Sequence, residues 1–289
     1  MHYRHAYHAA NFADVFKHVL LTGLLTGLSR KDKPWAFLDS HAGAGDYDLG
    51  HIAADTTGEW RSGIATLVEV DVDGGDVPAL VARYLKLVRA ANADGGFRFY
   101  PGSPRLAQWL ARPEIGDRLV LCEKVEEVAD ELRRAVRGAN AAIHVRDGYE
   151  AHALLPPPEK RGLILIDPPF ERGDEFEAAA ELIRKSVARF ANGVYAAWYP
   201  LKNAHVATKF VQRVARESGR PTLELMIETD APPRAPDANG IVKHPMTACG
   251  LVVVNPPFGF AEEASAALAF IAPLLAQGPK AGWAVNVVA

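Results

Sequence analysis

One acidic and one aromatic side chain directly follow a run of bulky apolar residues in the middle of the chain. Residues 163–166 read Leu-Ile-Leu-Ile, and Asp167, Pro168, Pro169 and Phe170 come next. An apolar run without alternation is typical of a strand that is buried on both faces, as in a parallel sheet. Proline lacks an N–H group and keeps the residue before it extended, so the strand ends at Asp167. Ligands bind outside the carboxyl ends of such strands, which places Asp167 and Phe170 at the mouth of a predicted site.

A glycine-containing loop follows an earlier predicted strand, which covers residues 35–39. The strand ends at Asp39, and His41, Gly43 and Gly45 lie in the loop after it. A strand that ends in an acid and continues into a Gly-x-Gly loop lets the backbone approach a nucleotide-like ligand. The loop is not the dinucleotide fingerprint, because the third glycine is absent and no helical pattern follows.

Two further predicted strands also end in acids. Residues 118–122 lead into Glu123, and residues 142–146 lead into Asp147 and Gly148. A carboxylate accepts two hydroxyl hydrogen bonds, so Glu123 suits a ribose diol, whereas Asp147 suits an adenine amino group. Each acid alone can equally be a turn or capping residue. The ordered series, continued by Asp167 on the next strand, favours a nucleoside-containing cofactor.

The elements that must position these side chains alternate regularly from residue 100 onward. Alternation of strands and helices predicts a doubly wound α/β sheet. Further helices are predicted at residues 12–28, 104–110, 125–137, 149–155, 175–190, 204–218 and 261–276, and further strands at 193–198, 222–228, 248–254 and 283–288. Between residues 46 and 100, only helical patterns at 59–70 and 77–93 are found. Such a long crossover predicts a small helical subdomain, residues 46–100, inserted into a core of residues 1–45 and 101–289.

Composition limits the class of protein. The chain has 289 residues, of which 49% are hydrophobic and 23% charged, so a sizeable core is expected. No apolar run reaches the roughly 18 residues of a membrane helix, and the first residues do not read as a signal peptide. Cys122 and Cys249 lie in apolar runs, which predicts buried free thiols, no metal site and a cytoplasmic location. With a net charge of −3, any nucleic-acid binding should depend on a local basic patch.

Two segments have more than one interpretation. Residues 2–8 are mostly aromatic, cationic or histidine, a composition that can stack on bases and contact phosphates. Asn11 is a predicted N-cap of the helix that follows, and Lys17 and His18 flank its apolar stripe; His18 can also be a partly buried helix histidine. Ser103 is a predicted N-cap with Pro104 at the first helical position, or alternatively faces the cofactor pocket.

The Pro-Pro-aromatic pattern occurs a second time, at residues 255–258, which read Asn-Pro-Pro-Phe. The Pro-Pro-aromatic pattern resembles a motif of amino-group methyltransferases. This copy ends what would be the seventh strand, which runs antiparallel to the others in their form of the sheet. Its carboxyl end would lie at the edge opposite the cofactor. We therefore assign chemistry to Asp167 and a structural turn to Asn255.

These motifs resemble those of methyltransferases. Residues 167–170 resemble the (Asp/Asn/Ser)-Pro-Pro-aromatic motif of enzymes that methylate amino groups, and residues 39–45 resemble the Asp-x-(Phe/His)-x-Gly-x-Gly loop of S-adenosylmethionine enzymes. The chain as a whole resembles the 23S ribosomal RNA adenine-N6 methyltransferase J (RlmJ) family. The resemblance is carried by residues 3–18, 31–45, 100–104, 161–170, 195–200 and 246–257; residues 60–97 and 229–245 resemble the family only loosely.

The resemblance implies a Rossmann-like methyltransferase core with a helical insertion, and methylation of an adenine in protein-free 23S rRNA by a monomeric enzyme. The cofactor, S-adenosylmethionine, would be held by Lys17, His18, Asp39, His41, Gly43, Gly45, Ser103, Glu123, Asp147, Gly148 and Asp167. The implied catalytic residues are Asp167, Pro168 and Phe170, and the implied RNA contacts are Tyr3, Arg4 and His5. Phe170 stands where tyrosine is common in the family, and Phe12 where histidine is frequent.

Other classes remain open from the sequence alone. A DNA adenine or protein glutamine methyltransferase would share the pocket but not the aromatic N-terminal segment. A non-catalytic RNA-binding module is a further alternative, against which the intact Asp167 and the Gly43/Gly45 loop count.

Overall fold

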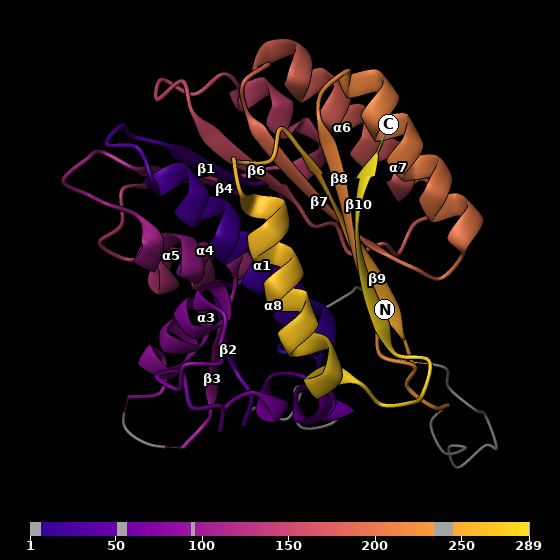
Figure 1. Cartoon of the computed structure of the whole chain (residues 1–289). Helices are drawn as coiled ribbons and strands as arrows, with labels where there is room; N and C mark the ends of the chain where they lie inside the picture. Colours follow the sequence, from indigo (N-terminus) through magenta and orange to yellow (C-terminus); the bar gives the residue numbers. More distant parts are fainter. Residues whose placement is uncertain (1–6, 51–56, 94–95, 234–244, 289) are drawn as a thin grey trace.

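The computed structural model describes residues 7–50, 57–93, 96–233 and 245–288. In these ranges one mixed sheet of eight strands forms the centre of the molecule (Figure 1), with the order β10-β8-β9-β7-β6-β1-β4-β5. Its strands are β1 (Ala36–Asp39), β4 (Arg118–Glu123), β5 (Ala141–Val145), β6 (Gly162–Ile166), β7 (Val194–Pro200), β8 (Thr222–Glu228), β9 (Ala248–Val254) and β10 (Gly282–Val288). The predicted α/β sheet is confirmed.

Strand direction decides which chain segments share an edge of the sheet. The neighbours β5, β4, β1, β6 and β7 are all parallel. Strand β9 runs antiparallel to both β7 and β8, and β10 runs antiparallel to β8. The loops after β6, β1, β4 and β5 therefore leave from one edge, which we call the carboxyl edge.

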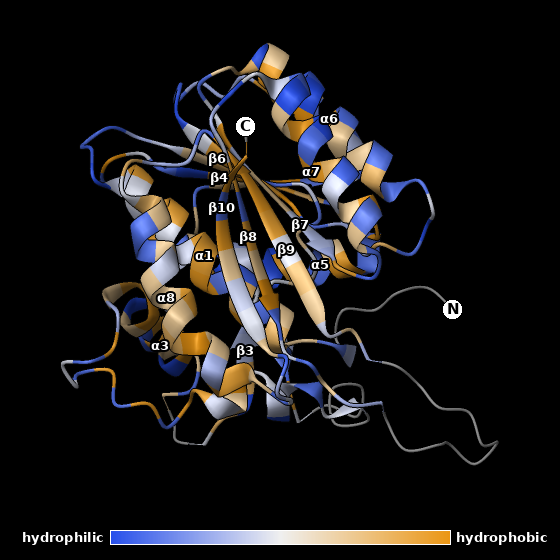
Figure 2. Ribbon diagram, turned by 45° about the vertical axis from the view of Figure 1, so that its right-hand side comes forward, coloured by the Kyte–Doolittle hydropathy of each residue, from blue (hydrophilic) through white to orange (hydrophobic). Residues whose placement is uncertain are grey.

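Successive side chains of a strand point to opposite faces of the sheet. Because consecutive residues of the central strands are apolar, both faces are apolar and both are covered by helices. Leu163 and Leu165 face a core shared with helices α1 (Phe12–Ser29) and α8 (Phe260–Leu275). Ile164 and Ile166 face a second core on the opposite side. Figure 2 shows α1 and α8 on one side of the sheet and α6 and α7 on the other. The first face also carries α4 (Ser103–Leu110) and α5 (Glu126–Ala135), and the second carries α6 (Glu175–Arg189), α7 (Ala204–Ser218) and the 3-10 helix η4 (Gly148–Leu154).

Helix α1 begins where the sequence predicts. The Asn11 side chain accepts hydrogen bonds from the N–H groups of Ala13 and Asp14, both at 3.0 Å, and so satisfies two otherwise unpaired donors. Almost the whole helix is buried between the sheet, the insertion and α8. Its polar side chains therefore need internal partners.

The segment between residues 46 and 100 differs in detail from the prediction. The helix expected at 59–70 is replaced by two short 3-10 turns, Glu59–Ser62 and Ile64–Thr66. A Cβ on Gly63 would lie 2.2 Å from the Ala10 carbonyl oxygen, so the chain bends here to pack against the start of α1. The helix expected at 77–93 is α3 (Ala79–Ala90). In addition, β2 (Asp46–Asp48) pairs with β3 (Phe99–Pro101), which was not predicted.

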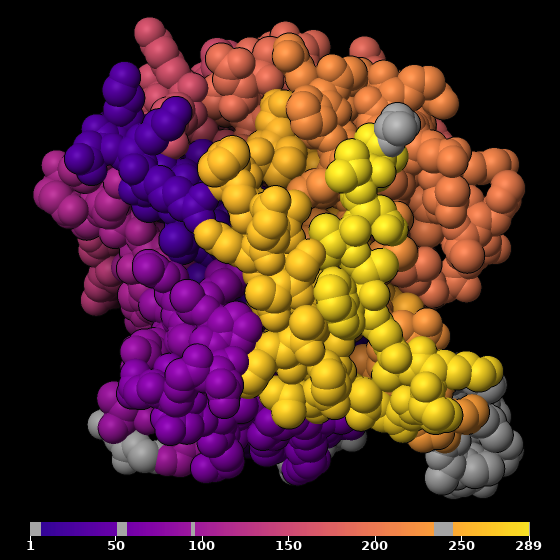
Figure 3. Space-filling view, viewed as in Figure 1, coloured from indigo at the N-terminus to yellow at the C-terminus, as the bar shows by residue number. Residues whose placement is uncertain are grey.

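The apolar side chains of this segment belong to the same core as α1 and α8. Leu80 and Tyr84 of α3 are buried in that core, and Figure 3 shows the insertion and α8 side by side on one surface. The division of the chain into a core and an inserted subdomain stays a prediction.

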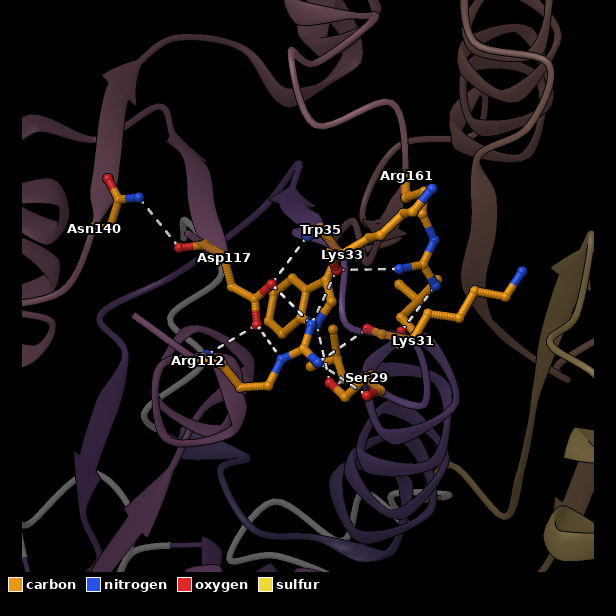
Figure 4. Close-up of polar contacts among 10 residues, drawn as sticks. Ser29, Lys31, Lys33, Trp35, Arg112, Asp117, Asn140 and Arg161 are labelled. Carbon is orange, nitrogen blue, oxygen red and sulfur yellow. Dashed lines mark hydrogen bonds and ion pairs between the residues drawn. The ribbon is translucent and has the colours of Figure 1, made fainter. Parts of the chain in front are cut away.

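An ion pair between the half-buried Arg112 and the buried Asp117 lies at the opposite, amino edge of the sheet (Figure 4). Arg112 donates to Asp117 through Nε at 2.8 Å and Nη2 at 3.1 Å, and Asp117 also accepts the Trp35 N–H at 3.0 Å. Arg112 Nη1 further donates to the Ser29 carbonyl at 2.9 Å. The network joins the end of α1 to the beginnings of β1 and β4. It therefore holds the start of β1 next to the start of β4.

Two expectations from composition can be compared with the described residues. Cys122 and Cys249 are buried free thiols, as predicted. None of the helices in these ranges has the length and apolar character required to span a membrane.

Candidate active site

Four acidic residues stand at the ends of four adjacent parallel strands. Asp39 ends β1 and Glu123 ends β4, while Asp147 and Asp167 follow β5 and β6 within two residues. Residues Asp39 and Leu165 are register partners, so Asp167 projects two residues beyond β1. The sheet thus gathers at its carboxyl edge side chains that are widely separated in the sequence.

Asp167 forms an ion pair with a lysine of α1. Lys17 Nζ donates a short hydrogen bond to Asp167 Oδ2, and it also donates to Asp14 Oδ1 at 2.9 Å. The side chains of Lys17 and Asp14 are 6% and 3% exposed, and that of Asp167 is 17% exposed. Burial alone would lower the pKa of Lys17, but the two carboxylates raise it well above its ordinary value. Lys17 therefore stays charged and holds the Asp167 carboxylate in one orientation.

Asp39 is fully buried beside this ion pair. Ser103 Oγ donates to Asp39 Oδ2 at 2.6 Å, and the His41 N–H donates to Asp39 Oδ1 at 3.1 Å. Burial raises the pKa of Asp39 to about 7, although the Ser103 hydrogen bond acts in the opposite direction. Ser103 is the first residue of α4 and Gly102 is its N-cap, so Ser103 does not cap the helix as first predicted. Its hydroxyl donates to Asp39 instead, and the alternative interpretation, that Ser103 faces the cofactor, stays a prediction.

His41 belongs to the loop that follows β1 and contacts η4, which follows β5. Its Nδ1 is 2.7 Å from Ser40 Oγ, and its ring meets the Tyr149 ring edge to face at 5.0 Å. Burial lowers the pKa of His41 to about 4, so the imidazole is neutral at physiological pH. A neutral ring of this kind can pack against a ligand and donate or accept one hydrogen bond.

Two glycines allow the backbone to come close at this edge. The Gly43 N–H donates to Glu123 Oε2 at 3.1 Å, with Gly43 in the left-handed region at φ +62°. A Cβ on Gly148 would lie 1.9 Å from the Ser40 carbonyl oxygen, so only glycine fits there. The second loop glycine, Gly45, also has a positive φ, and its carbonyl accepts the Gly102 N–H at 2.7 Å.

Asp147 borders a surface hollow of about 550 Å³ between η4 and α6. It accepts a hydrogen bond from Lys124 Nζ at 2.9 Å and from the Tyr149 N–H at 3.0 Å. Partial burial opposes ionisation, but these two donors lower the pKa of Asp147 overall. The opposite wall of the hollow includes Arg172, whose guanidinium carbon lies 5.4 Å from the centre of the Tyr149 ring.

Phe170 adopts an uncommon backbone conformation. Its φ is +49°, in the left-handed region that non-glycine residues rarely occupy. Its ring is half-buried, with ring centres at 4.8 Å from Phe176 and 5.8 Å from Trp198. This packing stabilises the turn after Asp167 and holds one aromatic ring at the carboxyl edge.

His18 lies one residue beyond Lys17 but contacts the insertion. Its Nδ1 is 2.8 Å from the Tyr100 hydroxyl, which is 3.0 Å from the Tyr84 hydroxyl. All three side chains are buried. Tyr100 belongs to β3, which leads directly to Ser103, so this contact couples α1 to the loop that carries Ser103.

Known proteins resemble the chain over most of its length. A family model described as "Ribosomal RNA large subunit methyltransferase D, RlmJ" matches residues 32–289. The chain is 37% identical over 258 residues to "Ribosomal RNA large subunit methyltransferase J" of Escherichia coli (strain K12), which covers 89% of this chain and 87% of that protein. The chain belongs to the RlmJ family.

Two further similarities extend over nearly the whole length. The Haemophilus influenzae protein of the same name is 34% identical over 289 residues, covering 98% of this chain and 97% of that protein. The crystal structure of protein LPL1258 from Legionella pneumophila has a TM-score of 0.85 and 31% identity, covering 98% of this chain and 99% of the other. Membership of the RlmJ family makes the chain an S-adenosylmethionine-dependent methyltransferase, as the motifs predict.

The second copy of the motif lies at the opposite edge in this RlmJ family member. Asn255 Nδ2 donates to the carbonyl groups of Ala191 and Gly193, at 3.0 and 2.9 Å, just before β7 begins. The predicted antiparallel direction of β9 is therefore confirmed, and Asn255 ties a turn together far from Asp167.

The structure also shows site residues that the sequence did not reveal. Asp14 of α1 is the second partner of Lys17. Tyr149 contacts His41, and Trp198 contacts Phe170. Trp198 stands at the end of a predicted strand, and this position could have indicated a site residue. No comparable feature of the sequence distinguishes Asp14. Tyr3, Arg4 and His5 lie outside the described residues.

Proposed function

We propose that this RlmJ family member methylates the exocyclic N6 amine of one adenine in 23S ribosomal RNA, with Asp167 as hydrogen-bond acceptor and base. The single observation that carries the proposal is the position of Asp167. It lies at the carboxyl edge beside the Asp39 loop, and it is oriented by Lys17 with its other oxygen, Oδ1, unengaged among the described residues. The names of the E. coli and H. influenzae relatives support large-subunit ribosomal RNA as the substrate class.

The residues at the carboxyl edge fit S-adenosylmethionine. We assign Glu123 to the ribose hydroxyls and Asp147 to the adenine amino group, because each is a carboxylate at the end of a neighbouring strand. Because Gly148 has no side chain, the loop after β5 can approach the Ser40 carbonyl and the His41 ring closely. The other residues that we propose to contact S-adenosylmethionine are Lys17, His18, Asp39, His41, Gly43, Gly45, Ser103 and Asp167. When bound, the cofactor supplies an electrophilic methyl group on a sulfonium.

The substrate side of the site consists of Asp167, Pro168 and Phe170. An adenine amino nitrogen is a poor nucleophile because its lone pair is delocalised into the ring, and the base must first leave its stack. Asp167 Oδ1 and the Pro168 carbonyl would accept the two amino hydrogens and so direct the lone pair of the nitrogen. The ring of Phe170 would support the face of the base.

Lys17 has two consequences for this chemistry. It occupies Oδ2 of Asp167, so only Oδ1 remains for the substrate. Its ammonium group also holds the Asp167 carboxylate in one orientation, so that Oδ1 can accept a hydrogen bond from the amine. Most of the rate enhancement would come from alignment and from the negative charge beside the nitrogen as it becomes cationic.

The remaining assignments follow from the family resemblance and the composition. Tyr3, Arg4 and His5 would contact the RNA, and residues 46–100 form an inserted subdomain. The substrate would be 23S rRNA without its ribosomal proteins, and the enzyme would act as a monomer in the cytoplasm.

Mapping of methyladenine in 23S rRNA tests the proposal. Protein-free 23S rRNA lacking the modification should gain N6-methyladenine at one position after incubation with this protein and S-adenosylmethionine. Duplex DNA and a glutamine-containing release-factor peptide, incubated in parallel, should remain unmodified. Methylation of DNA or peptide but not of RNA would replace the proposed function by one of those alternatives, and absence of any transfer with intact cofactor binding would favour a non-catalytic RNA-binding module.

A further inference from the structure

Helix α7 carries an excess of positive charge in a chain that is acidic overall. Residues 191–220 contain five lysines and arginines but a single acid, Glu217. The whole chain has a net charge of −3. A local basic patch of the kind that the composition requires for nucleic-acid binding is therefore present along this helix.

Lysine, arginine and other polar side chains form a stripe on the solvent face of α7. His205, Lys209, Gln212 and Arg216 follow one another at intervals of four, three and four residues, and all are exposed. Helical periodicity places them on one side of α7, with Lys202 at its beginning. We call these five residues the α7 stripe. Phe210, Val211 and Val214 occupy the opposite side and pack into the core. The polar outer surface of α6 and α7 is visible in Figure 2.

The charges of the stripe are available to a ligand. Arg213, which lies beside the stripe, forms ion pairs with Glu177 and Glu217. In the described ranges, Lys202, Lys209 and Arg216 have no such acidic partner within 4 Å. From His205 to Arg216 the helix rises about 16 Å, at about 1.5 Å per residue. That length can follow several consecutive phosphates of one nucleic-acid strand.

The stripe begins beside the proposed target-base pocket. Strand β7 ends at Pro200, and Trp198 within it contacts Phe170 at 5.8 Å. Asn203 then caps α7 by accepting the N–H of His205 at 3.0 Å. The first turn of α7 has no acidic residue, so the positive end of the helix dipole adds to the charge of Lys202. The stripe therefore leads away from the carboxyl edge along the flank of the molecule.

We propose that the α7 stripe binds the phosphodiester backbone of the RNA strand on one side of the target adenine. The inference rests on the proposed function for the choice of RNA as the polyanion. Lysine and arginine side chains spaced along an exposed helix neutralise phosphates without reading bases. The stripe thus contributes affinity and orientation, whereas the chemistry stays at Asp167.

The double variant Lys209→Ala/Arg216→Ala tests the inference with little risk to folding, because both side chains are exposed and alanine favours a helix. The KM for 23S rRNA should rise about tenfold at physiological salt, and the slope of log affinity against log salt should fall by about 1.4, or about 0.7 per lost single-strand contact. The kcat at saturating RNA and the Kd for S-adenosylmethionine should stay within about twofold of wild type.

The matched control is Lys31→Ala/Lys33→Ala, which removes two exposed cations at the amino edge of the sheet. It should leave the KM and the salt slope unchanged. Equal effects of the two double variants would mean that overall charge, not the stripe, governs binding, and an unchanged KM and slope in the α7 variant would also overturn the inference.

Direct binding of a fluorescent 23S rRNA fragment separates this inference from the proposed function. If wild-type protein binds the fragment but transfers no methyl group, the proposed function fails, while the comparison of the two double variants still decides the role of the stripe. If wild-type protein methylates RNA and the α7 variant binds it with wild-type affinity, only the inference about the stripe is wrong.

Discussion

Lys17 joins Asp14 and Asp167 through one buried ammonium group, although Asp167 lies 150 positions further along the chain. Charged groups are expensive to bury unless they are paired, so these three side chains depend on one another. Because Lys17 belongs to α1 and Asp167 to the loop after β6, the same contact attaches the N-terminal helix to the proposed catalytic loop. The orientation of Asp167 is therefore a property of the fold as well as of its own loop.

Replacement of Lys17 by methionine should destabilise the protein. The Lys17→Met variant leaves two carboxylates in a poorly hydrated place, and breaking such a pair lowers the free energy of unfolding by about 3–5 kcal/mol. Urea denaturation measures this loss. In the Asp14→Asn/Lys17→Met double variant one of the unpaired charges is gone, so the loss should be smaller than in Lys17→Met alone. A single variant that loses less than about 1 kcal/mol would show that the ion pair is not a structural requirement.

Cofactor binding should release a proton from Asp39. Burial raises its pKa to about 7, so the carboxyl group is about half ionised at neutral pH. A cationic ligand nearby favours the ionised form, so binding of S-adenosylmethionine at pH 7 should release about half a proton. Affinity should accordingly rise as pH increases through 7 and level off above it. His41, with a pKa of about 4, does not titrate in this range.

Calorimetry in two buffers of different ionisation enthalpy counts the released protons. The Asp39→Asn variant should release none, and its affinity should be independent of pH between about 6 and 8. The same proton count in both proteins would assign the titration to another group and remove Asp39 from direct contact with the cofactor charge.

A methyl group at position 148 should block the cofactor site. In Gly148→Ala the new Cβ would meet the Ser40 carbonyl oxygen at 1.9 Å, and a backbone atom cannot move aside by changing rotamer. The loop of Asp147 must shift, so the Kd for S-adenosylmethionine should rise at least about tenfold, with a stability loss of about 1–3 kcal/mol. Gly75→Ala is the control, because nothing lies within 4 Å of its Cβ. Cofactor binding by Gly148→Ala at the level of this control would mean that the close approach is unimportant.

Much of the sheet could be predicted because strand ends carry a local signal. Asp39, Glu123 and Asp167 each follow an apolar run, and the direction of β9 explains why Asn255 lies elsewhere. The pairing of β2 with β3 could not be predicted, because strands of three residues have no measurable periodicity. The helix predicted at 59–70 is interrupted at Gly63, where the backbone packs against Ala10. Such a contact between distant segments cannot be predicted from the local sequence.

The site itself was predicted less completely than the sheet. Residues at strand ends were identified, but their partners were not, because a hydrogen bond between Ser103 and Asp39 or an ion pair between Lys17 and Asp167 leaves no pattern in the sequence. The helix that begins at Ser103 is shifted by one position from the expected cap, which is within the usual uncertainty of helix ends. Because of that shift, the Ser103 hydroxyl donates to Asp39 and does not cap the helix.

A single-turnover measurement of methyl transfer by Asp167→Ala tests the central claim most directly. Protein in excess over 23S rRNA, with labelled S-adenosylmethionine, reports the transfer step separately from product release. Transfer by the variant should be abolished, while its cofactor Kd stays within about tenfold of wild type and its RNA affinity is unchanged. Methyl transfer by Asp167→Ala at the wild-type rate would contradict the role of Asp167 as acceptor and base.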